Sequence, residues 1–195
     1  MNNEATIRQY EADDVQETLK MFAESWENAA RVSQAGKPTL DLAERAIQMY
    51  SKNAVSDEVK IVEEQNKMSE YRFNQIATDT SGKIVGLVRG RKDLLPEHLT
   101  KMLKTDESIG YYLSSLYVDH QMQGVGIGGK LLEKFLEWSS GDEIVYTDVD
   151  INNEQAVAFY NKMGFKKVAS SEHQRENSDV ILMDFVYEPQ DAIEK

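Results

Sequence analysis

A glycine-rich segment at residues 119–130 carries the clearest chemical signal in the sequence. It reads Asp-His-Gln-Met-Gln-Gly-Val-Gly-Ile-Gly-Gly-Lys, with four glycines in the six residues from Gly124 to Gly129. Glycine lets a backbone turn tightly and approach a ligand, and the helix that should follow offers unpaired N–H groups at its positive end. A flexible connection or close packing would seldom need so many glycines. The segment therefore predicts a phosphate-binding loop.

One interpretation of this loop is a dinucleotide-binding fingerprint. Gly124, Gly126 and Gly129 have the required spacing, and Asp148 lies near the position of a ribose-binding acid. However, five residues separate Val118 from Gly124, and only 47 residues follow Asp148. A nicotinamide-dependent oxidoreductase therefore remains the minor alternative.

A second interpretation is the P-loop of nucleotide triphosphatases, which Gly124, Gly129 and Lys130 also fit. The next position of a P-loop must be serine or threonine, because its hydroxyl binds magnesium. Here that position is Leu131, which cannot bind a metal. We therefore set the P-loop aside.

The composition narrows the class of protein. The chain has 195 residues, of which 41% are hydrophobic and 29% charged, which is typical of a globular protein with one sizeable core. We expect a single domain over residues 1–188 and a tail at 189–195. The net charge is 22 − 34 = −12, which argues against nucleic-acid and membrane partners.

The absence of cysteine excludes disulfides, thiolate metal sites and thiol nucleophiles. The three histidines are scattered along the sequence and no calcium-loop spacing occurs, so we expect no metal. The amino terminus lacks the pattern of a secretory signal, and no apolar run approaches the roughly 18 residues of a membrane span. These features predict a cytoplasmic protein.

The elements that must position the loop follow from periodicity and turn signals. We expect strands at 5–10, 73–78, 84–90, 111–118, 143–149, 166–169 and 180–186. A first helix should begin at Asp13–Asp14 and carry the apolar stripe Val15, Leu19, Phe22 and Trp26. A second should begin at Thr39, and a short one should lie within 91–107. Further helices are expected at 56–67, 127–138 and 155–163. This order predicts an α/β (α+β) fold with a mixed, mostly antiparallel central sheet and helices on both faces.

Two motifs in register suggest a family. The loop satisfies the pattern Q/R-x-x-G-x-G/A through Gln123, Gly126 and Gly128. A second pattern, V-x-x-x-N-x-x-A-x-x-F/L-Y-x-x-x-G-F, is matched without a gap by Val149, Asn153, Ala156, Phe159, Tyr160, Gly164 and Phe165. With Leu116-x-Val118 on the preceding strand, the sequence resembles the GNAT superfamily of N-acetyltransferases over residues 116–165.

The resemblance implies acetyl-coenzyme A as cosubstrate, transfer to a primary amine, and no metal. The cofactor-binding positions that it implies are Leu116, Tyr117, Val118, Gln123, Gly124, Val125, Gly126, Ile127, Gly128, Gly129, Asn153 and Tyr160. Tyr160 matches the family tyrosine that can protonate the leaving thiolate. The other interpretations are that Tyr160 is a core aromatic residue and that Asn153 is a helix cap.

The sequence departs from the family pattern at the position of the general base. Many relatives carry an acid two residues before the leucine of L-x-V, and this chain has Ser114 there. Asp148, near the end of the neighbouring strand, is our candidate catalytic base, and a role in binding solvent or substrate is the alternative.

For the acceptor we expect a small cationic amine, which an acidic surface would attract. Residues 28–71 should form the wall of its site, with acidic and aromatic candidates in and just before this segment: Glu24, Trp26, Glu27, Tyr50, Glu63 and Glu64. A binding module that senses coenzyme A without turning it over is the alternative from another class. Assembly as a homodimer is left open.

Overall fold

A computed structural model describes residues 5–33, 52–105, 109–139, 143–168, 172–174 and 181–187. In chain order the elements are β1 (Thr6–Gln9), η1 (Ala12–Asp14), α1 (Val15–Ser33), α3 (Lys52–Lys67), β2 (Arg72–Thr78), β3 (Ile84–Leu94), α4 (Glu97–Leu103), β4 (Ile109–Val118), η2 (His120–Met122), α5 (Ile127–Trp138), β5 (Val145–Asp150), α6 (Glu154–Lys162), β6 (Lys166–Lys167), β7 (His173–Gln174) and β8 (Ile181–Tyr187). The expected helix from Thr39 and the tail at 189–195 lie outside the described residues.

The strands form a mixed sheet whose hydrogen-bonded order is β1-β2-β3-β4-β5-β8-β6, with β7 also paired to β8. The pairs β1–β2, β5–β8, β6–β8 and β7–β8 are antiparallel, and β4–β5 is parallel. This confirms the predicted fold class. The chain divides into two compact units, residues 1–89 with 115–134 and residues 90–114 with 135–195, and β3 and β4 contribute to both.

In the first unit, α1 and α3 cover β2 and β3. Val15, Leu19 and Phe22 of the predicted stripe are buried together with Val62 of α3 and Ile76 of β2. The side chain of Trp26 lies outside the described residues. Burying these side chains holds both helices on the strands that lead to the glycine loop.

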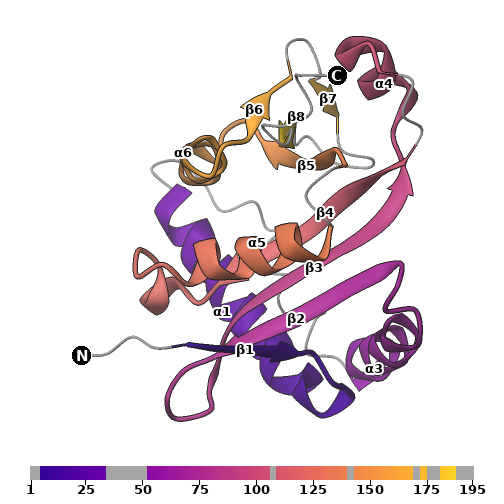
Figure 1. Cartoon of the computed structure of the whole chain (residues 1–195). Coiled ribbons are helices and arrows are strands. Elements are labelled where there is room, and N and C mark those ends of the chain that lie inside the picture. The colour runs from indigo at the N-terminus through magenta and orange to yellow at the C-terminus, as the bar shows by residue number, and fades with distance from the viewer. Residues whose placement is uncertain are drawn as a thin grey trace. The chain divides into compact units, whose positions relative to one another are not determined.

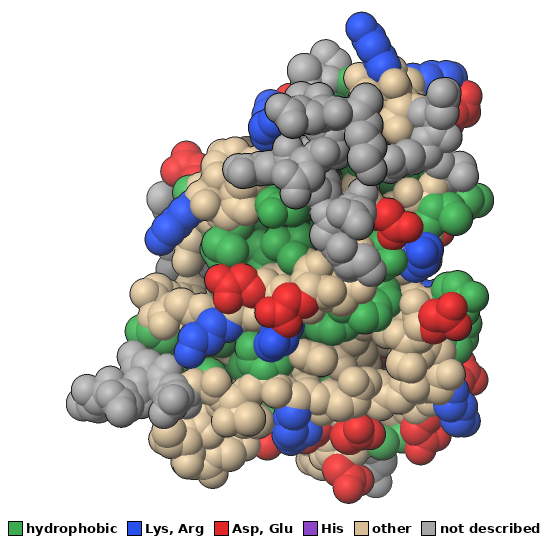
Figure 2. All heavy atoms as spheres, in the orientation of Figure 1, with side chains coloured by type: hydrophobic (Ala, Val, Ile, Leu, Met, Phe, Trp, Pro, Cys, Tyr) green, Lys and Arg blue, Asp and Glu red, His purple; other side chains and the backbone are tan. Residues whose placement is uncertain are grey.

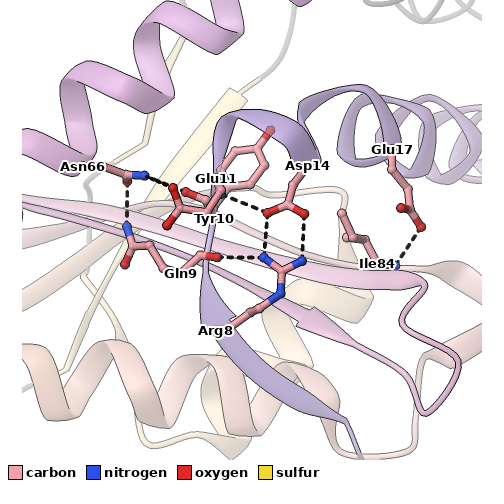
Figure 3. A network of polar contacts seen from close by, with 8 residues as sticks. All are labelled: Arg8, Gln9, Tyr10, Glu11, Asp14, Glu17, Asn66 and Ile84. Carbon is pink, nitrogen blue, oxygen red and sulfur yellow. Dashed lines mark hydrogen bonds and ion pairs between the residues drawn. The ribbon is translucent and has the colours of Figure 1, made fainter.

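The start of α1 is fixed by a polar network that Figure 3 shows. Arg8 of β1 makes a bidentate pair with Asp14, with both N–O distances at 2.7 Å, and the Asp14 carboxylate accepts from the Glu11 N–H at 2.9 Å. The Asn66 amide of α3 donates to the Tyr10 carbonyl at 2.8 Å. The predicted start at Asp13–Asp14 is confirmed, because η1 holds these residues and α1 follows directly.

In the second unit, β8 pairs with β5 over six residues, from Val145 opposite Tyr187 to Asp150 opposite Leu182. Figure 1 shows β5, β8 and β6 side by side, with α6 next to them. Leu99 of α4 packs in a cluster with Tyr146 and Val186, whereas the Tyr160 ring of α6 contacts Phe185. Because Val186 and Phe185 are successive residues of a strand, α4 and α6 cover opposite faces.

Strand β3 extends four residues beyond the expected end at Gly90. Arg91 lies over the Tyr112 ring at 4.6 Å, and Lys92 lies over the Tyr111 ring at 5.3 Å. Successive charged side chains thus stack on aromatic residues of β4, on alternate faces. The sequence pattern predicts that the strand ends at Gly90, whereas the cation–π contacts with rings of β4 favour its continuation through Arg91 and Lys92.

We expect Gly86→Ala to lower the free energy of unfolding by about 1–3 kcal/mol, because the added methyl group overpacks the contact with α5. A Cβ at Gly86 would lie 2.8 Å from Leu131 Cδ1 and 3.1 Å from the Tyr117 carbonyl oxygen. Urea unfolding followed by circular dichroism measures the change.

The control for this prediction is Gly82→Asn, at a turn with φ +88° and nothing within 4 Å of the Cβ position. Asparagine tolerates the left-handed region, so its loss should stay below about 1 kcal/mol. Equal losses for the two variants would contradict a packing requirement at residue 86.

Candidate functional site

The glycine loop of the first unit joins β4 to α5. Gly124 and Gly126 have φ values of +79° and +94°, and a Cβ at either position would have nothing within 4 Å. Their backbone conformation, rather than crowding by the protein, therefore favours glycine. Gln123, Gly124, Val125 and Gly126 are exposed, so the loop presents its main chain to solvent ahead of a 12-residue helix.

A buried carboxylate anchors the start of this loop. The Asp119 N–H donates to the Val85 carbonyl of β3 at 2.9 Å. Its side chain, 4% exposed, accepts from Lys83 Nζ at 2.8 Å and from the Gln121 N–H at 3.0 Å. Burial raises the pKa of Asp119, but these donors outweigh it, so the pKa lies below its usual value. The sequence prediction missed this role, which the position of an acid directly after a strand could have indicated.

The other predicted residues of this unit lie directly before and after the exposed part of the loop. Leu116, Tyr117 and Val118 are half-buried at the end of β4, and the Gln123 amide donates to the Val118 carbonyl at 3.3 Å. Ile127 is fully buried and anchors the first turn of α5. Gly128 and Gly129 follow in that turn and are half-buried.

The second unit holds Tyr160 and Asn153 on α6. Tyr160 is buried, and its ring centroid lies 5.3 Å from Phe159, 5.3 Å from Phe165 and 6.1 Å from Phe185. Asn153 caps the helix, since its side chain accepts from the Ala156 N–H at 3.0 Å. The geometry thus gives each residue the structural role named as its alternative, and a structural role does not prevent a chemical one.

Asp148 lies on β5, half-buried, with a hydrogen-bond donor beside it. The Tyr112 hydroxyl of β4 donates to Asp148 Oδ1. Burial, followed by the charge of Asp148, raises the pKa of Tyr112 well above its usual value, so this phenol remains protonated. In the antiparallel register Asp148 is opposite Asp184 of β8. Neither Tyr112 nor Asp184 was predicted, although an acid inside the apolar run at 180–186 was a signal.

The two predicted catalytic residues belong to opposite faces of this sheet. Residues directly opposite in an antiparallel ladder share a face, which places Asp148 with Asp184. Phe185 faces the other way and contacts the Tyr160 ring. The predicted base and the predicted acid are thus on different faces of the sheet.

The residues expected around an acceptor are described only in part. Glu24, Glu63, Glu64 and Ser114 are exposed. The side chains of Trp26 and Glu27, and all of Tyr50, lie outside the described residues. On the face drawn in Figure 2, Lys and Arg side chains lie among Asp and Glu side chains, so both signs of charge occur there.

Two features are absent from the described part of the chain. None of its helices is both long and apolar enough to cross a bilayer. Within the same residues, no grouping of three or more His, Asp or Glu side chains could hold a metal ion.

The mixed sheet, with a glycine loop between β4 and α5, has the arrangement seen in solved N-acetyltransferases. The model of the Acetyltransferase (GNAT) family matches residues 39–165, which is 127 of the 195 residues. The chain therefore belongs to the GNAT acetyltransferase family and is an acyltransferase.

Similar proteins support this assignment. The chain is 34% identical over 103 residues to the peptidyl-lysine N-acetyltransferase YjaB of Salmonella typhimurium, covering 49% of this chain and 69% of that protein. It is 30% identical to an N-alpha-acetyltransferase of Sulfurisphaera tokodaii, covering 60% of this chain and 71% of that protein. The PaiA N-acetyltransferase of Thermoplasma acidophilum, solved in complex with coenzyme A, has the same fold, with a TM-score of 0.64 at 16% identity over 94% of this chain and 99% of that one.

We expect Lys83→Met to reduce stability by about 1 kcal/mol at pH 7, because it removes the cation paired with buried Asp119. The pKa of Asp119 is lowered by folding, so the ion pair contributes above the ordinary value of 3.8. As the pH falls through the lowered folded pKa, the difference between variant and wild type should disappear. Urea unfolding at several pH values between 7 and 3 measures it.

Lys60→Met is the control, since Lys60 and its partner Asp57 are both 69% exposed and should contribute little. A Lys83→Met deficit that stays constant at acid pH would contradict the electrostatic explanation and assign the effect to the aliphatic stem of Lys83.

Proposed function

We propose that this protein transfers the acetyl group of acetyl-coenzyme A directly to a primary amine. The observation that carries the proposal is the exposed main chain of the glycine loop, with positive φ at Gly124 and Gly126 and open space at both Cβ positions. Such a loop, at the start of a 12-residue helix, suits a diphosphate. Residues 111–195 carry 7 − 15 = −8 of the net charge, which would repel an anion. A bound diphosphate therefore needs N–H donors close to it, and the exposed main chain of the loop can supply them.

The cofactor roles in this proposal are those that the family resemblance implies. The backbone N–H groups from Gln123 to Gly129 bind the pyrophosphate, with Asn153 as a further cofactor contact. The main chain of Leu116, Tyr117 and Val118 pairs with the pantetheine arm, and one of its N–H groups stabilises the oxyanion formed at the thioester carbonyl. The side chains there can be apolar, since only backbone groups take part.

Tyr160 is the proposed general acid. In direct transfer, the neutral amine attacks the thioester carbon, the C–S bond breaks, and the leaving thiolate needs a proton. A phenol held by three aromatic neighbours would have a fixed orientation for that task. Asp148 lies on the other face, where its carboxylate can attract the acceptor's ammonium group.

For the acceptor we favour a lysine-type primary amine on a peptide. The name of the Salmonella typhimurium relative gives peptidyl-lysine as its acceptor. A lysine side chain is a cationic amine, and a protein of acidic composition would attract it. A small free polyamine is the second candidate, and the net charge of −12 supports both equally.

The deciding experiment measures thiol release from acetyl-coenzyme A with lysine peptides, peptides whose amino terminus is free but which lack lysine, and polyamines. We expect turnover of lysine peptides in the wild type, and none with Gly126→Val, because a β-branched residue is strained at φ +94° and would displace the main chain that is proposed to bind the diphosphate. Calorimetry should show that the variant has lost coenzyme A binding while it still unfolds cooperatively. Binding without turnover of any amine would overturn the transferase proposal, and preference for polyamines would overturn the peptide acceptor.

Tyr160→Phe should lower kcat at least tenfold with little change in coenzyme A affinity, since it removes only the proton donor. The loss should be greatest at low pH, because above the ordinary thiol pKa of about 8.5 the thiolate can leave without protonation. Steady-state kinetics from pH 6 to 9 measure this. Tyr187→Phe, in the same aromatic cluster, is the matched control and should keep wild-type kcat. Equal kcat in all three proteins would remove Tyr160 from the acid role.

A further inference from the structure

Two histidines flank a buried carboxylate in the second unit. Nε2 of His98, on α4, lies 2.9 Å from Asp184 Oδ2, and Nδ1 of His173, on β7, lies 3.8 Å from the same oxygen. The Asp184 side chain is only 5% exposed, whereas the histidine side chains are 49% and 43% exposed. The carboxylate is therefore buried beneath rings that solvent and ligands can reach.

This cluster lies on the same face of the sheet as Asp148. Asp148 and Asp184 are directly opposite in the β5–β8 ladder, and Tyr146 is two residues before Asp148 on the same strand. Burial raises the pKa of Tyr146 to about 12, and the charged groups that act on it there are Asp93, Arg91, Asp184 and Asp148. The charged groups that act on Tyr146 thus come from β3, β5 and β8. His173 approaches Asp184 from β7, and Glu97 and Lys101 lie near His98 in the sequence of α4.

The contact with Asp184 determines which nitrogen of His98 can do chemistry. An ionised carboxylate only accepts hydrogen bonds, so a neutral His98 must carry its proton on Nε2. Nδ1 is then the nitrogen that can accept a proton. Imidazole is the side chain that exchanges protons most readily near neutral pH, and the residue at the family's acidic position, Ser114, is a poor base.

We propose that His98, oriented by Asp184, is the general base that deprotonates the acceptor amine. This proposal depends on the transferase function proposed above. His98 Nδ1 takes one proton from the acceptor's ammonium group, and the neutral amine attacks the thioester carbon. As the C–S bond breaks, Tyr160 gives its proton to the thiolate, and the second proton of the nitrogen passes through water to the Tyr160 phenolate. His98 then releases its proton to water, so the reaction yields amide, thiol and one proton.

The two faces of the sheet make this assignment coherent. Tyr160 packs against Phe185 on the α6 face, and His98 contacts Asp184, the preceding residue, from the α4 face. A nucleophile and a leaving group occupy different sides of a carbonyl carbon in the tetrahedral intermediate. The amine and the sulfur can therefore be served by two different groups, which in this assignment are His98 and Tyr160, with Asp184 as a positioning residue for His98.

The experiment compares pH profiles of kcat/KM for the acceptor in wild type, His98→Gln and Asp184→Asn. We expect His98→Gln to lower kcat/KM about 10²-fold at pH 7 and to shift the acid limb of the profile toward higher pH, where the acceptor amine loses its proton to solvent. Asp184→Asn should lower kcat/KM less, because the ring remains but its tautomer is no longer fixed. His173→Gln, equally exposed and on the same carboxylate, is the matched control and should keep the wild-type profile.

Two further readouts separate a base from a structural residue. Added imidazole should restore turnover to His98→Ala, and an acceptor amine of low pKa should be acetylated almost equally by wild type and His98→Gln. Coenzyme A binding, measured by calorimetry, should be unchanged in every variant. A wild-type acid limb retained in His98→Gln, or no rescue by imidazole in a folded His98→Ala, would overturn the proposal. Failure of the transferase function itself would show differently, as absence of thiol release in the wild type.

Discussion

The glycine loop depends on one buried carboxylate. Asp119 binds β3 through its own N–H, accepts from Gln121 at the following turn, and pairs with Lys83. These contacts fix the direction in which the chain leaves β4. Exposed glycines have little side-chain packing to hold them, so their geometry must be set at the ends of the loop. Asp119 does so at one end, and buried Ile127 does so at the other.

Most of the fold could be predicted because local signals agreed with the tertiary structure. The helix predicted at 127–138 coincides with α5, whose apolar stripe is uninterrupted and whose start is marked by glycine. The helix predicted at 155–163 agrees with α6 to within one residue at each end. The agreement is close because two residues that the sequence shows, the cap Asn153 and the positive-φ Gly164, mark the limits of this helix. The end of β3 could not be predicted in the same way, since Arg91 and Lys92 are held by aromatic rings of β4 that are distant in sequence.

The residues of the candidate site could be predicted where they belong to motifs that are continuous in the sequence. The loop and the 149–165 pattern locate Gly126, Asn153 and Tyr160 without knowledge of any contact. The polar cluster around Asp184 has no such pattern, because His98, His173 and Asp184 come from three separate elements. Only the pairing of β8 with β5 and β7, and the packing of α4 on that face, bring these side chains together.

The order of the strands also has a consequence for solubility. Strand β6 ends the hydrogen-bonded order and consists of two exposed lysines, and β7, which pairs with β8 off that path, is also two residues long. A long free edge would offer its N–H and C=O groups to another chain, and short, charged terminal strands are a common defence against such edge-to-edge aggregation. Lys166 and Lys167 thus let the long apolar strand β8 lie near the margin of the sheet without becoming a template for unwanted polymers.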